Sequence, residues 1–224
     1  MITFYHKTGG IAIETQRKNW LEQRKKGIGA SDAAAILGCN PYKTNVALWE
    51  EKTGLRQAED ISEKPYVKYG TEAEQYLREL FRLDFPQYEV TYDQYARIAN
   101  LKKYPFLFAT LDGVLLEKET GRKGVLEIKT TEILNSTQLF KWKNRIPDNY
   151  YIQVLHQLLV TGYDFVIVKA QIKFSFNGVR LETRHYTIER KEVLQDMKFL
   201  LQKEIAFWNC VTERKKPNLI LPSI

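Results

Sequence analysis

The sequence has few cysteines and no long hydrophobic run. Its two cysteines, Cys39 and Cys210, lie far apart in the 224 residues. Two thiols supply neither a disulfide framework nor the ligands of a zinc site. No apolar stretch approaches the roughly 20 residues of a membrane span, and the N-terminal MITFYHKTGG lacks the apolar core of a signal peptide. We therefore expect a cytoplasmic protein without membrane association.

Acidic residues are fewer than basic ones. The chain carries 27 Asp and Glu against 34 Lys and Arg, which gives a formal net charge of +7. Such an excess favours a polyanionic partner, because Lys and Arg on a phosphate backbone release condensed counterions. The sequence shows no internal repeat and no low-complexity linker, and a chain of this length buries one hydrophobic core by default. We expect a single domain over residues 1–224.

The stretch from Leu111 to Thr131, LDGVLLEKETGRKGVLEIKTT, predicts two strands joined by a charged turn. Asp112 lies near the start of the first strand, and Glu127 and Lys129 lie in the second. Successive strand side chains alternate between faces at roughly 3.3 Å per residue, so Glu127 and Lys129 point the same way about 6.6 Å apart. The pattern predicts that two carboxylates and one ammonium group share a patch.

These residue types suit metal-dependent cleavage of phosphodiesters. Asp112 and Glu127 are hard oxygen ligands that can share Mg²⁺ with water and phosphate oxygens. Lys129 is placed to orient or deprotonate an attacking water and to balance charge. The alternative is a surface hairpin in which Lys129 only pairs with one carboxylate. The strand is otherwise apolar around Glu127, and charged groups are seldom buried without partners or a task, so the site is favoured.

A glycine-rich segment, GIGASDAAAILG, follows a helix expected from about Gln16 to Lys26, with Trp20 and Arg24 on one face. Ser31 is a natural N-cap for a short helix after it. Two interpretations stay open from the residues alone. The helix N-terminus and Arg24 could bind an anion, or Ser31 could only cap its helix while Arg24 is solvated.

A helix is expected from about Pro65 to Leu83. Glu74 lies at the edge of its apolar stripe, where a helix can present a carboxylate to a site beside the core, whereas Glu72 lies further toward solvent. Glu72 is the substitute if Glu74 proves remote, and a solvated Glu74 is the alternative. The apolar stripe comprises Ala73, Leu77, Leu80 and Phe81.

A second strong helix is expected from Asp148 to Gly162. Tyr150, Gln153 and Gln157 form a polar stripe opposite its apolar side, and His156 beside them suits a hydrogen-bonded structural role. A shorter helix before it, Ser136 to Arg145, carries a basic and aromatic cluster that either follows a phosphate backbone or is solvated. That cluster comprises Lys141, Trp142, Lys143 and Arg145.

The remainder predicts a buried strand from Phe165 to Phe174, a type I′ turn at Asn177-Gly178 and a returning strand to Ile188. A long amphipathic helix, from about Arg190 to Arg214, closes the chain.

The spacing D-G-x(13)-E-x-K, from Asp112 to Lys129, resembles the core of the PD-(D/E)xK nuclease superfamily. Three flanking segments narrow the resemblance to the lambda-exonuclease-like (YqaJ-type) recombination nucleases of phages and prophages. They are W-x(3)-R-x(2)-G-x-G-A-S-D around Arg24, G-x(3)-E ending at Glu74, and the Q-V pair at Gln153. The proline usual before the aspartate is Leu111 here, a departure that affects backbone shape and no chemical group.

The resemblance implies an α/β fold with a restriction-endonuclease-like core, a central mixed sheet flanked by helices. It implies Mg²⁺, or Mn²⁺ as a substitute, and a role for Lys129 and Glu74 in catalysis. It further implies that Arg24 and Ser31 bind a terminal 5′-phosphate, and that Gln153 contacts the phosphate near the metal. The implied metal ligands are Asp112, Glu127 and the backbone carbonyl of Ile128.

The implied function is a Mg²⁺-dependent 5′-to-3′ exonuclease on linear double-stranded DNA that leaves 3′ single-stranded tails for recombination. The implied partners are DNA ends, further copies in a homo-oligomeric ring, and a single-strand annealing protein in a bacterial host cell. One alternative is another nuclease of the superfamily, either an endonuclease or an iron–sulfur exonuclease, although the latter needs about four cysteines. The other is a non-catalytic DNA-binding module.

Overall fold

The computed structural model describes Thr15, residues 19–175 and residues 178–222. Residues 19–25 are helical, as expected, while Gln16 lies outside the described residues. The first half of the chain then forms β1 (Ile28–Gly29), α2 (Ala30–Ile36), α3 (Asn45–Lys52), α4 (Pro65–Asp84), β2 (Tyr88–Thr91), β3 (Leu107–Phe108), β4 (Gly113–Glu117) and β5 (Lys123–Ile133). The second half forms α5 (Ser136–Phe140), α6 (Asp148–Thr161), β6 (Phe165–Phe174), β7 (Arg180–Glu189), the 3₁₀ turn η1 (Arg190–Glu192) and α7 (Leu194–Thr212).

The central sheet has five strands in the order β2-β4-β5-β6-β7. Strands β4 and β5 form the predicted antiparallel hairpin, whereas β5 and β6 run parallel over ten residue pairs, from Gly124↔Phe165 to Ile133↔Phe174. The parallel pairing is possible because α6 lies between these strands in sequence and returns the chain to the same end of the sheet. The sheet is therefore mixed, and the predicted fold class is confirmed.

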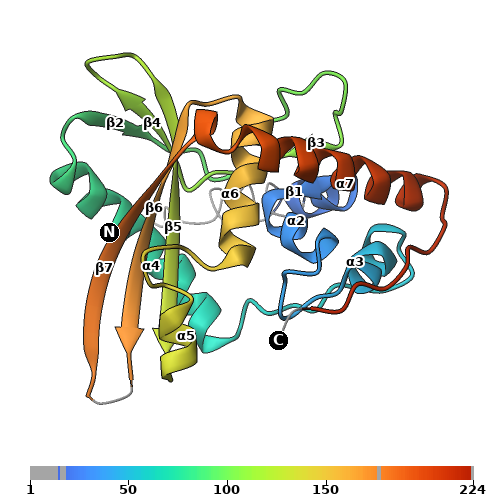
Figure 1. The fold of residues 1–224 in the computed structure, drawn as a ribbon, viewed down its shortest axis with the longest axis horizontal. Helices are drawn as coiled ribbons and strands as arrows, with labels where there is room; N and C mark the ends of the chain where they lie inside the picture. Colours follow the sequence, from blue (N-terminus) through green and yellow to red (C-terminus); the bar gives the residue numbers. More distant parts are fainter. Residues whose placement is uncertain (1–14, 16–18, 176–177, 223–224) are drawn as a thin grey trace, which may run out of the picture.

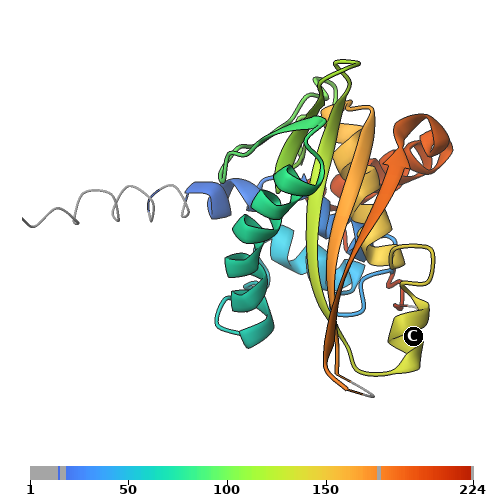
Figure 2. The ribbon, with the colours of Figure 1, turned by 90° about the vertical axis from the view of Figure 1, so that its left-hand side faces the viewer.

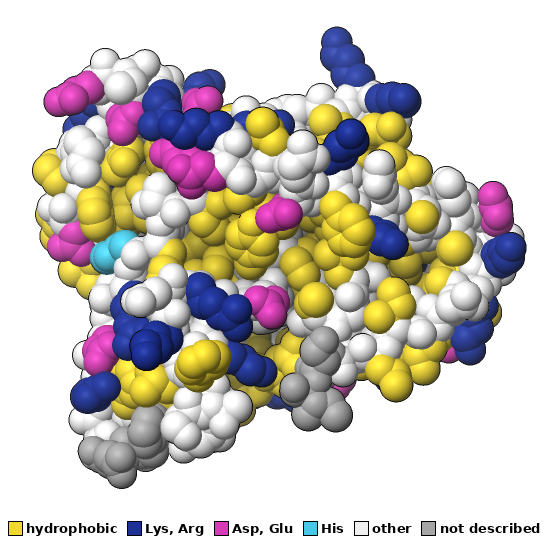
Figure 3. Space-filling model, in the orientation of Figure 1, with side chains coloured by type: hydrophobic (Ala, Val, Ile, Leu, Met, Phe, Trp, Pro, Cys, Tyr) yellow, Lys and Arg dark blue, Asp and Glu magenta, His cyan; other side chains and the backbone are white. Residues whose placement is uncertain are grey.

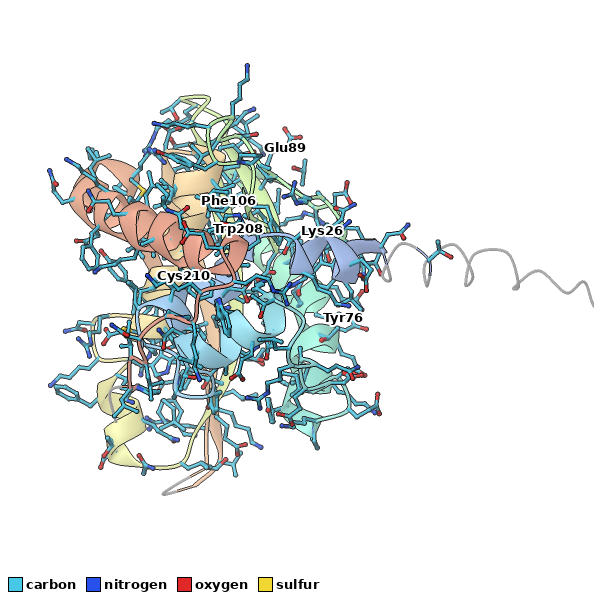
Figure 4. All side chains as sticks on the ribbon, turned by 90° about the vertical axis from the view of Figure 1, so that its right-hand side faces the viewer. Lys26, Tyr76, Glu89, Phe106, Trp208 and Cys210 are labelled. Carbon is cyan, nitrogen blue, oxygen red and sulfur yellow. The ribbon has the colours of Figure 1, made fainter. Side chains whose placement is uncertain are left out.

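Helices cover both faces of the sheet (Figures 1 and 2). Figure 2 shows α4 on one side and α6 and α7 on the other. The larger apolar core lies on the α6 side, and a smaller one lies under α4 around Phe81 and Leu126. On the outer side of the larger core, Trp208 of α7 stacks on Phe106 with ring centroids 5.2 Å apart (Figure 4). The hairpin of β4 and β5 thus lies in the middle layer, between two helical layers.

A buried ion pair joins α6 to α7. The Nδ1 atom of His156 lies 2.5 Å from Oε1 of Glu204, and Nε2 lies 2.9 Å from the carbonyl oxygen of Phe108. Neither His156 nor Glu204 is exposed. Burial by itself lowers the pKa of His156, but Glu204 and the Phe108 carbonyl outweigh it and the net pKa is raised. The predicted structural role of His156 is confirmed.

The polar stripe of α6 faces β5 and not solvent, and Gln157 in it is 1% exposed. Two local predictions are wrong, and each has a packing reason. Leu80 is 48% exposed, because the face of α4 that meets the sheet runs through Leu77, Arg78 and Phe81. The helix that begins at Ser136 ends at Phe140, and the Trp142 side chain beyond it is buried in the larger core.

Two further predictions concern a helix cap and a turn: the cap differs from expectation, and the turn is only partly described. Helix α2 is capped by Gly29 and not by Ser31, because Asp32 at its third position accepts a hydrogen bond from the Gly29 N–H. The turn predicted at Asn177-Gly178 lies only partly within the described residues, since Asn177 falls outside them. In the described ranges, no helix is long and apolar enough to cross a membrane.

Candidate active site

Six of the predicted site residues line one open cavity of about 330 Å³. Its walls come from α4, from Asp112 just before β4, from β5 and from the first turns of α6. Helix α4 approaches β5 closely here because its residue 70 is a glycine: a Cβ on Gly70 would lie 3.1 Å from Oγ1 of Thr130. We call this cavity the acidic pocket. The predicted residues that line it are Glu74, Asp112, Glu127, Ile128, Lys129 and Gln153.

Glu127 is the most firmly held side chain of the acidic pocket, and only 2% of it is exposed. Its Oε1 atom lies 2.5 Å from Nζ of Lys129 and accepts a hydrogen bond from Nε2 of Gln153 at 2.7 Å. Its Oε2 atom accepts a hydrogen bond from Nε2 of Gln157 at 2.6 Å. A buried carboxylate with three charged or amide donors is fixed in direction.

Lys129 is the only cation that contacts Glu127 among the described residues. Its Nζ also donates to Oε1 of Gln153 at 3.0 Å and lies 4.8 Å from the centre of the Tyr150 ring. Burial by itself lowers the pKa of Lys129, but Glu127 and Asp112 outweigh it, so the net pKa is raised. The side chain is therefore an ammonium group, suited to orienting a ligand and balancing charge more than to removing a proton.

Asp112 is fixed at both its backbone and its side chain. Its Oδ2 accepts a hydrogen bond from the Ile128 N–H at 2.8 Å, and its carbonyl oxygen accepts one from Nε of Arg78 at 2.6 Å. The pKa of Asp112 is raised well above its usual value, first by the loss of surrounding water and then by the charges of Glu127 and Glu74. The carboxylates repel one another, and a bound cation would relieve that repulsion.

Glu74 enters the acidic pocket from α4 and forms an ion pair with Arg78 one turn later. Burial raises its pKa, the Arg78 guanidinium lowers it and Glu127 raises it again, with a net rise. Glu72 is exposed and does not line the pocket, so the structure places Glu74 and not its substitute beside the other carboxylates.

The donors of the acidic pocket suit a hard divalent cation that keeps water ligands. No three His, Cys, Asp or Glu side chains of the described ranges form a ready-made ligand cluster. Asp112 and Glu127 are two carboxylates of the pocket that could serve as ligands, and Ile128 lines the same pocket. Mg²⁺ favours a coordination in which one or two protein carboxylates are joined by several water or phosphate oxygens. The donor set therefore fits such a cation.

Sequence reasoning missed two side chains of this region, Arg78 and Gln157. Both are buried, and each lies one helical turn after a predicted residue, Arg78 after Glu74 and Gln157 after Gln153. Side chains four apart on a helix are neighbours, so this spacing was the available signal. A polar helix residue is most often solvated, which is why the spacing alone did not single them out.

Arg24 and Ser31 contact each other, and neither is hydrogen-bonded to Gln153 among the described residues. Arg24 donates from Nη2 to Oγ of Ser31 at 2.7 Å, and its guanidinium lies 4.6 Å from the centre of the Trp20 ring. Neither residue lines the acidic pocket, and no hydrogen bond between described residues joins them to Gln153. The structure therefore brings together two of the three predicted phosphate-binding residues.

Comparison with known proteins gives a family and a fold. The sequence profile of the YqaJ-like viral recombinase domain matches residues 19–164. The chain is 35% identical to the YqaJ protein of Bacillus subtilis (strain 168) over 202 residues, which covers 88% of this chain and 56% of that protein. It is 28% identical to protein R354 of Acanthamoeba polyphaga mimivirus over 163 residues, which covers 68% of this chain and 28% of that protein. The chain thus spans little more than half of the first relative and less of the second.

Two solved structures share the fold. An alkaline exonuclease from Laribacter hongkongensis superposes with a TM-score of 0.62 at 17% identity, over 88% of this chain and 94% of that one. A phage-related exonuclease from Haemophilus somnus 129PT superposes with a TM-score of 0.55 at 14% identity, over 84% and 96%. At these identities the likeness concerns the arrangement of helices and strands.

Proposed function

Because the chain belongs to the family of YqaJ-like viral recombinase domains, we propose that it is a metal-dependent exonuclease acting on linear double-stranded DNA. The observation that carries the proposal is the acidic pocket, where Asp112, Glu127 and Lys129 converge from a single hairpin. The fold shared with two exonucleases supports the nuclease role. We propose one nuclease domain over residues 1–224, in the cytoplasm of a bacterial host.

The cation that we propose is Mg²⁺, with Mn²⁺ as a substitute, held by Asp112, Glu127 and the Ile128 carbonyl. When bound, it would polarise the scissile phosphate and lower the pKa of a water ligand. Lys129 holds its proton at Nζ and orients the attacking water while balancing the negative charge that develops on the phosphate. Gln153 fixes Glu127 and Lys129 together, and its position suits contact with the phosphate group.

The proposed polarity is 5′ to 3′, and it rests on Arg24 and Ser31. Their side chains are already hydrogen-bonded to each other, and a guanidinium beside a hydroxyl can hold a terminal 5′-phosphate through charge-assisted bonds. The product would be a duplex with a 3′ single-stranded tail, and the proposed partners are further copies in a ring and a single-strand annealing protein.

The basic surface suits a DNA backbone. Lys141, Lys143 and Arg145 are exposed around α5, and Figure 3 shows Lys and Arg side chains gathered on this part of the molecule. Because Trp142 points into the core, contact with DNA in this segment would use the charged side chains and not the indole.

Digestion of linear and covalently closed circular forms of one plasmid tests the proposal. With Mg²⁺ or Mn²⁺ we expect the linear form to be degraded and the circle to persist, and we expect Ca²⁺ to inhibit because its looser geometry does not align the attacking water. The Asp112→Asn variant is the control for contaminating nucleases. Cleavage of the circle would indicate an endonuclease, and full activity in excess chelator would refute the metal.

A further inference from the structure

Arg78 is a buried cation that contacts two residues of the acidic pocket, and neither the hairpin motif nor the family resemblance assigns it. It lies in α4 and is 5% exposed. Its Nε donates to the carbonyl oxygen of Asp112 at 2.6 Å, and its Nη2 pairs with Oε1 of Glu74. Its guanidinium carbon lies 3.5 Å from the centre of the Tyr92 ring. One planar group thus links α4 to Asp112, just before β4, and to Tyr92, just after β2.

The two hydrogen-bond partners of Arg78 are the two points at which α4 and β4 deliver carboxylates to the pocket. Since the Asp112 side chain is held by the Ile128 N–H, its residue is anchored from both sides, by β5 and by Arg78. The fork of a guanidinium fixes both the distance and the direction between its partners, which a single ammonium cannot do. Stacking on Tyr92 removes the remaining freedom of the guanidinium plane.

A second arginine on the same helix makes the same kinds of contact, but with residues that do not line the acidic pocket. Arg82 lies one turn further along α4, pairs with Glu79 and donates from Nη2 to the carbonyl oxygen of Val90 at 2.9 Å. Neither Glu79 nor Val90 lines the acidic pocket. If an arginine of this type served only to attach α4 to the neighbouring backbone, the two residues would be equivalent.

We propose that Arg78 is a positioning residue that fixes Asp112 through its backbone and holds the Glu74 carboxylate beside it, so that the pocket is shaped for a divalent cation before the cation arrives. The inference rests on the proposed function in that it takes the pocket to bind such a cation. Residues that orient metal ligands typically contribute about 10- to 100-fold to affinity when they are removed singly.

The sign of the effect separates positioning from simple charge. Arg78 is itself positive, so if it acted only through its charge, its removal would tighten cation binding. If it acts by positioning, its removal weakens binding in spite of the charge that is lost. Arg78→Met removes both hydrogen bonds and the charge, whereas Arg78→Lys keeps the charge and loses the fork.

The test is calorimetric titration of the free, full-length protein with Mn²⁺, which needs no DNA and no turnover. We expect Arg78→Met to raise the dissociation constant about 10- to 100-fold and Arg78→Lys to raise it by a smaller factor of the same sign. Arg82→Met is the matched control and should leave the constant within twofold of wild type. On linear duplex, the loss should fall in kcat and leave KM for DNA ends unchanged.

Each outcome has a definite meaning. A constant for Arg78→Met that is unchanged, or tighter than wild type, would overturn the positioning role, and so would equal weakening in Arg78→Met and Arg82→Met. If Arg78→Met does not fold, the sign of the change in Arg78→Lys decides in the same way. Asp112→Asn separates the two proposals: if it leaves Mn²⁺ binding intact, the metal site itself is wrong, whereas if it abolishes binding, the Arg78 result stands alone.

Discussion

The acidic pocket and the Arg24–Ser31 pair were predicted together, yet they are built differently. Glu127 has three side-chain donors and is 2% exposed, and Asp112 is anchored through its backbone and its carboxylate. Arg24 and Ser31 share one hydrogen bond at the exposed surface and a stacked Trp20. The pocket is a network in which every member restrains another, and the pair is a contact that water can replace.

The difference follows from burial. A buried polar group that loses its partner keeps its desolvation cost, so the partners of Glu127 must be present whether or not ligand is bound. An exposed guanidinium is hydrated when unpaired, and its partner can change when a phosphate arrives. We therefore expect the pocket to tolerate almost no substitution and the pair to matter mainly when DNA ends are bound.

The largest expected effect is at the pocket. Asp112→Asn and Glu127→Gln should each abolish cleavage while duplex binding survives, because each removes a metal-binding charge and little backbone contact. Lys129→Ala should be similarly inactive yet still bind metal. Several kcal/mol of transition-state stabilisation correspond to about 10³-fold or more in rate. Rates on linear duplex measure cleavage, and gel-shift affinities measure duplex binding. Near-normal turnover in any of the three variants would refute the assignment of the hairpin as the active site.

The next largest effect is expected at a second buried network, the ion pair of His156 and Glu204, and it concerns stability. Glu204→Gln should lower the free energy of unfolding by about 3–5 kcal/mol, because it leaves a buried imidazolium without its counter-charge. The raised pKa of His156 gives the sign with pH: the stabilisation is fully present below about pH 6.5 and is lost as pH rises through the raised pKa. Urea unfolding at pH 6 and pH 9 should show the larger deficit at pH 6.

An exposed ion pair beside Arg24 is the control for that measurement. Lys25 and Glu22 lie 2.7 Å apart with side chains 64% and 54% exposed, and Lys25→Gln should change stability by only about 0–1 kcal/mol at either pH. A deficit in Glu204→Gln as small as that in Lys25→Gln would show that burial does not separate the two regions.

The third prediction concerns the exposed pair when a ligand is present. A duplex with 5′-phosphate ends should be digested about 10- to 150-fold faster than one with 5′-hydroxyl ends, since a lost charge-assisted contact costs about 1.5–3 kcal/mol. Arg24→Ala should erase most of that preference and leave metal binding intact. Equal rates on the two wild-type substrates would refute the phosphate site, and reduced stability without a change in preference would identify a purely structural arginine.

The smallest expected effect tests how little the free protein depends on the pair. Ser31→Ala should change the free energy of unfolding by no more than about 0.5 kcal/mol, because Gly29 and not Ser31 caps α2. Thr44→Ala is the matched comparison, since the Thr44 hydroxyl accepts a hydrogen bond from the Ala47 N–H and caps α3. Its loss should cost about 1 kcal/mol. Thermal unfolding of both variants measures the difference, and equal losses would restore a capping role to Ser31.

How much of the molecule the sequence predicts depends on the kind of signal. Alternation along β5 and the spacing to Asp112 brought the hairpin residues together correctly, because strand geometry is fixed by the backbone. The positions of Glu74 and Gln153 followed from helical faces and from the family resemblance. Both signals are periodic: side chains two positions apart on a strand, or three to four apart on a helix, share a face, and the sequence shows this spacing directly.

Other features depend on the direction in which a helix faces a distant element. Gln157 and Arg78 are buried because α6 and α4 turn those sides toward the hairpin, and Leu80 is exposed for the same reason. The periodicity of one helix does not specify its rotation relative to a strand far away in sequence. That Gln153 lines the acidic pocket and the Arg24–Ser31 pair does not is a tertiary feature, and it is equally absent from the local pattern.

The parallel pairing of β5 with β6 has a consequence for the time course of folding. Glu127 pairs with Val168 and Lys129 pairs with Ala170, each 41 positions further along the chain. Contacts of such sequence separation form slowly, because the intervening loop must be closed before the ladder gains any bonds. We expect β5 to acquire its final geometry late, after α6 has formed. A chain that is still emerging from the ribosome would then carry the complete hairpin motif and yet have no nuclease activity.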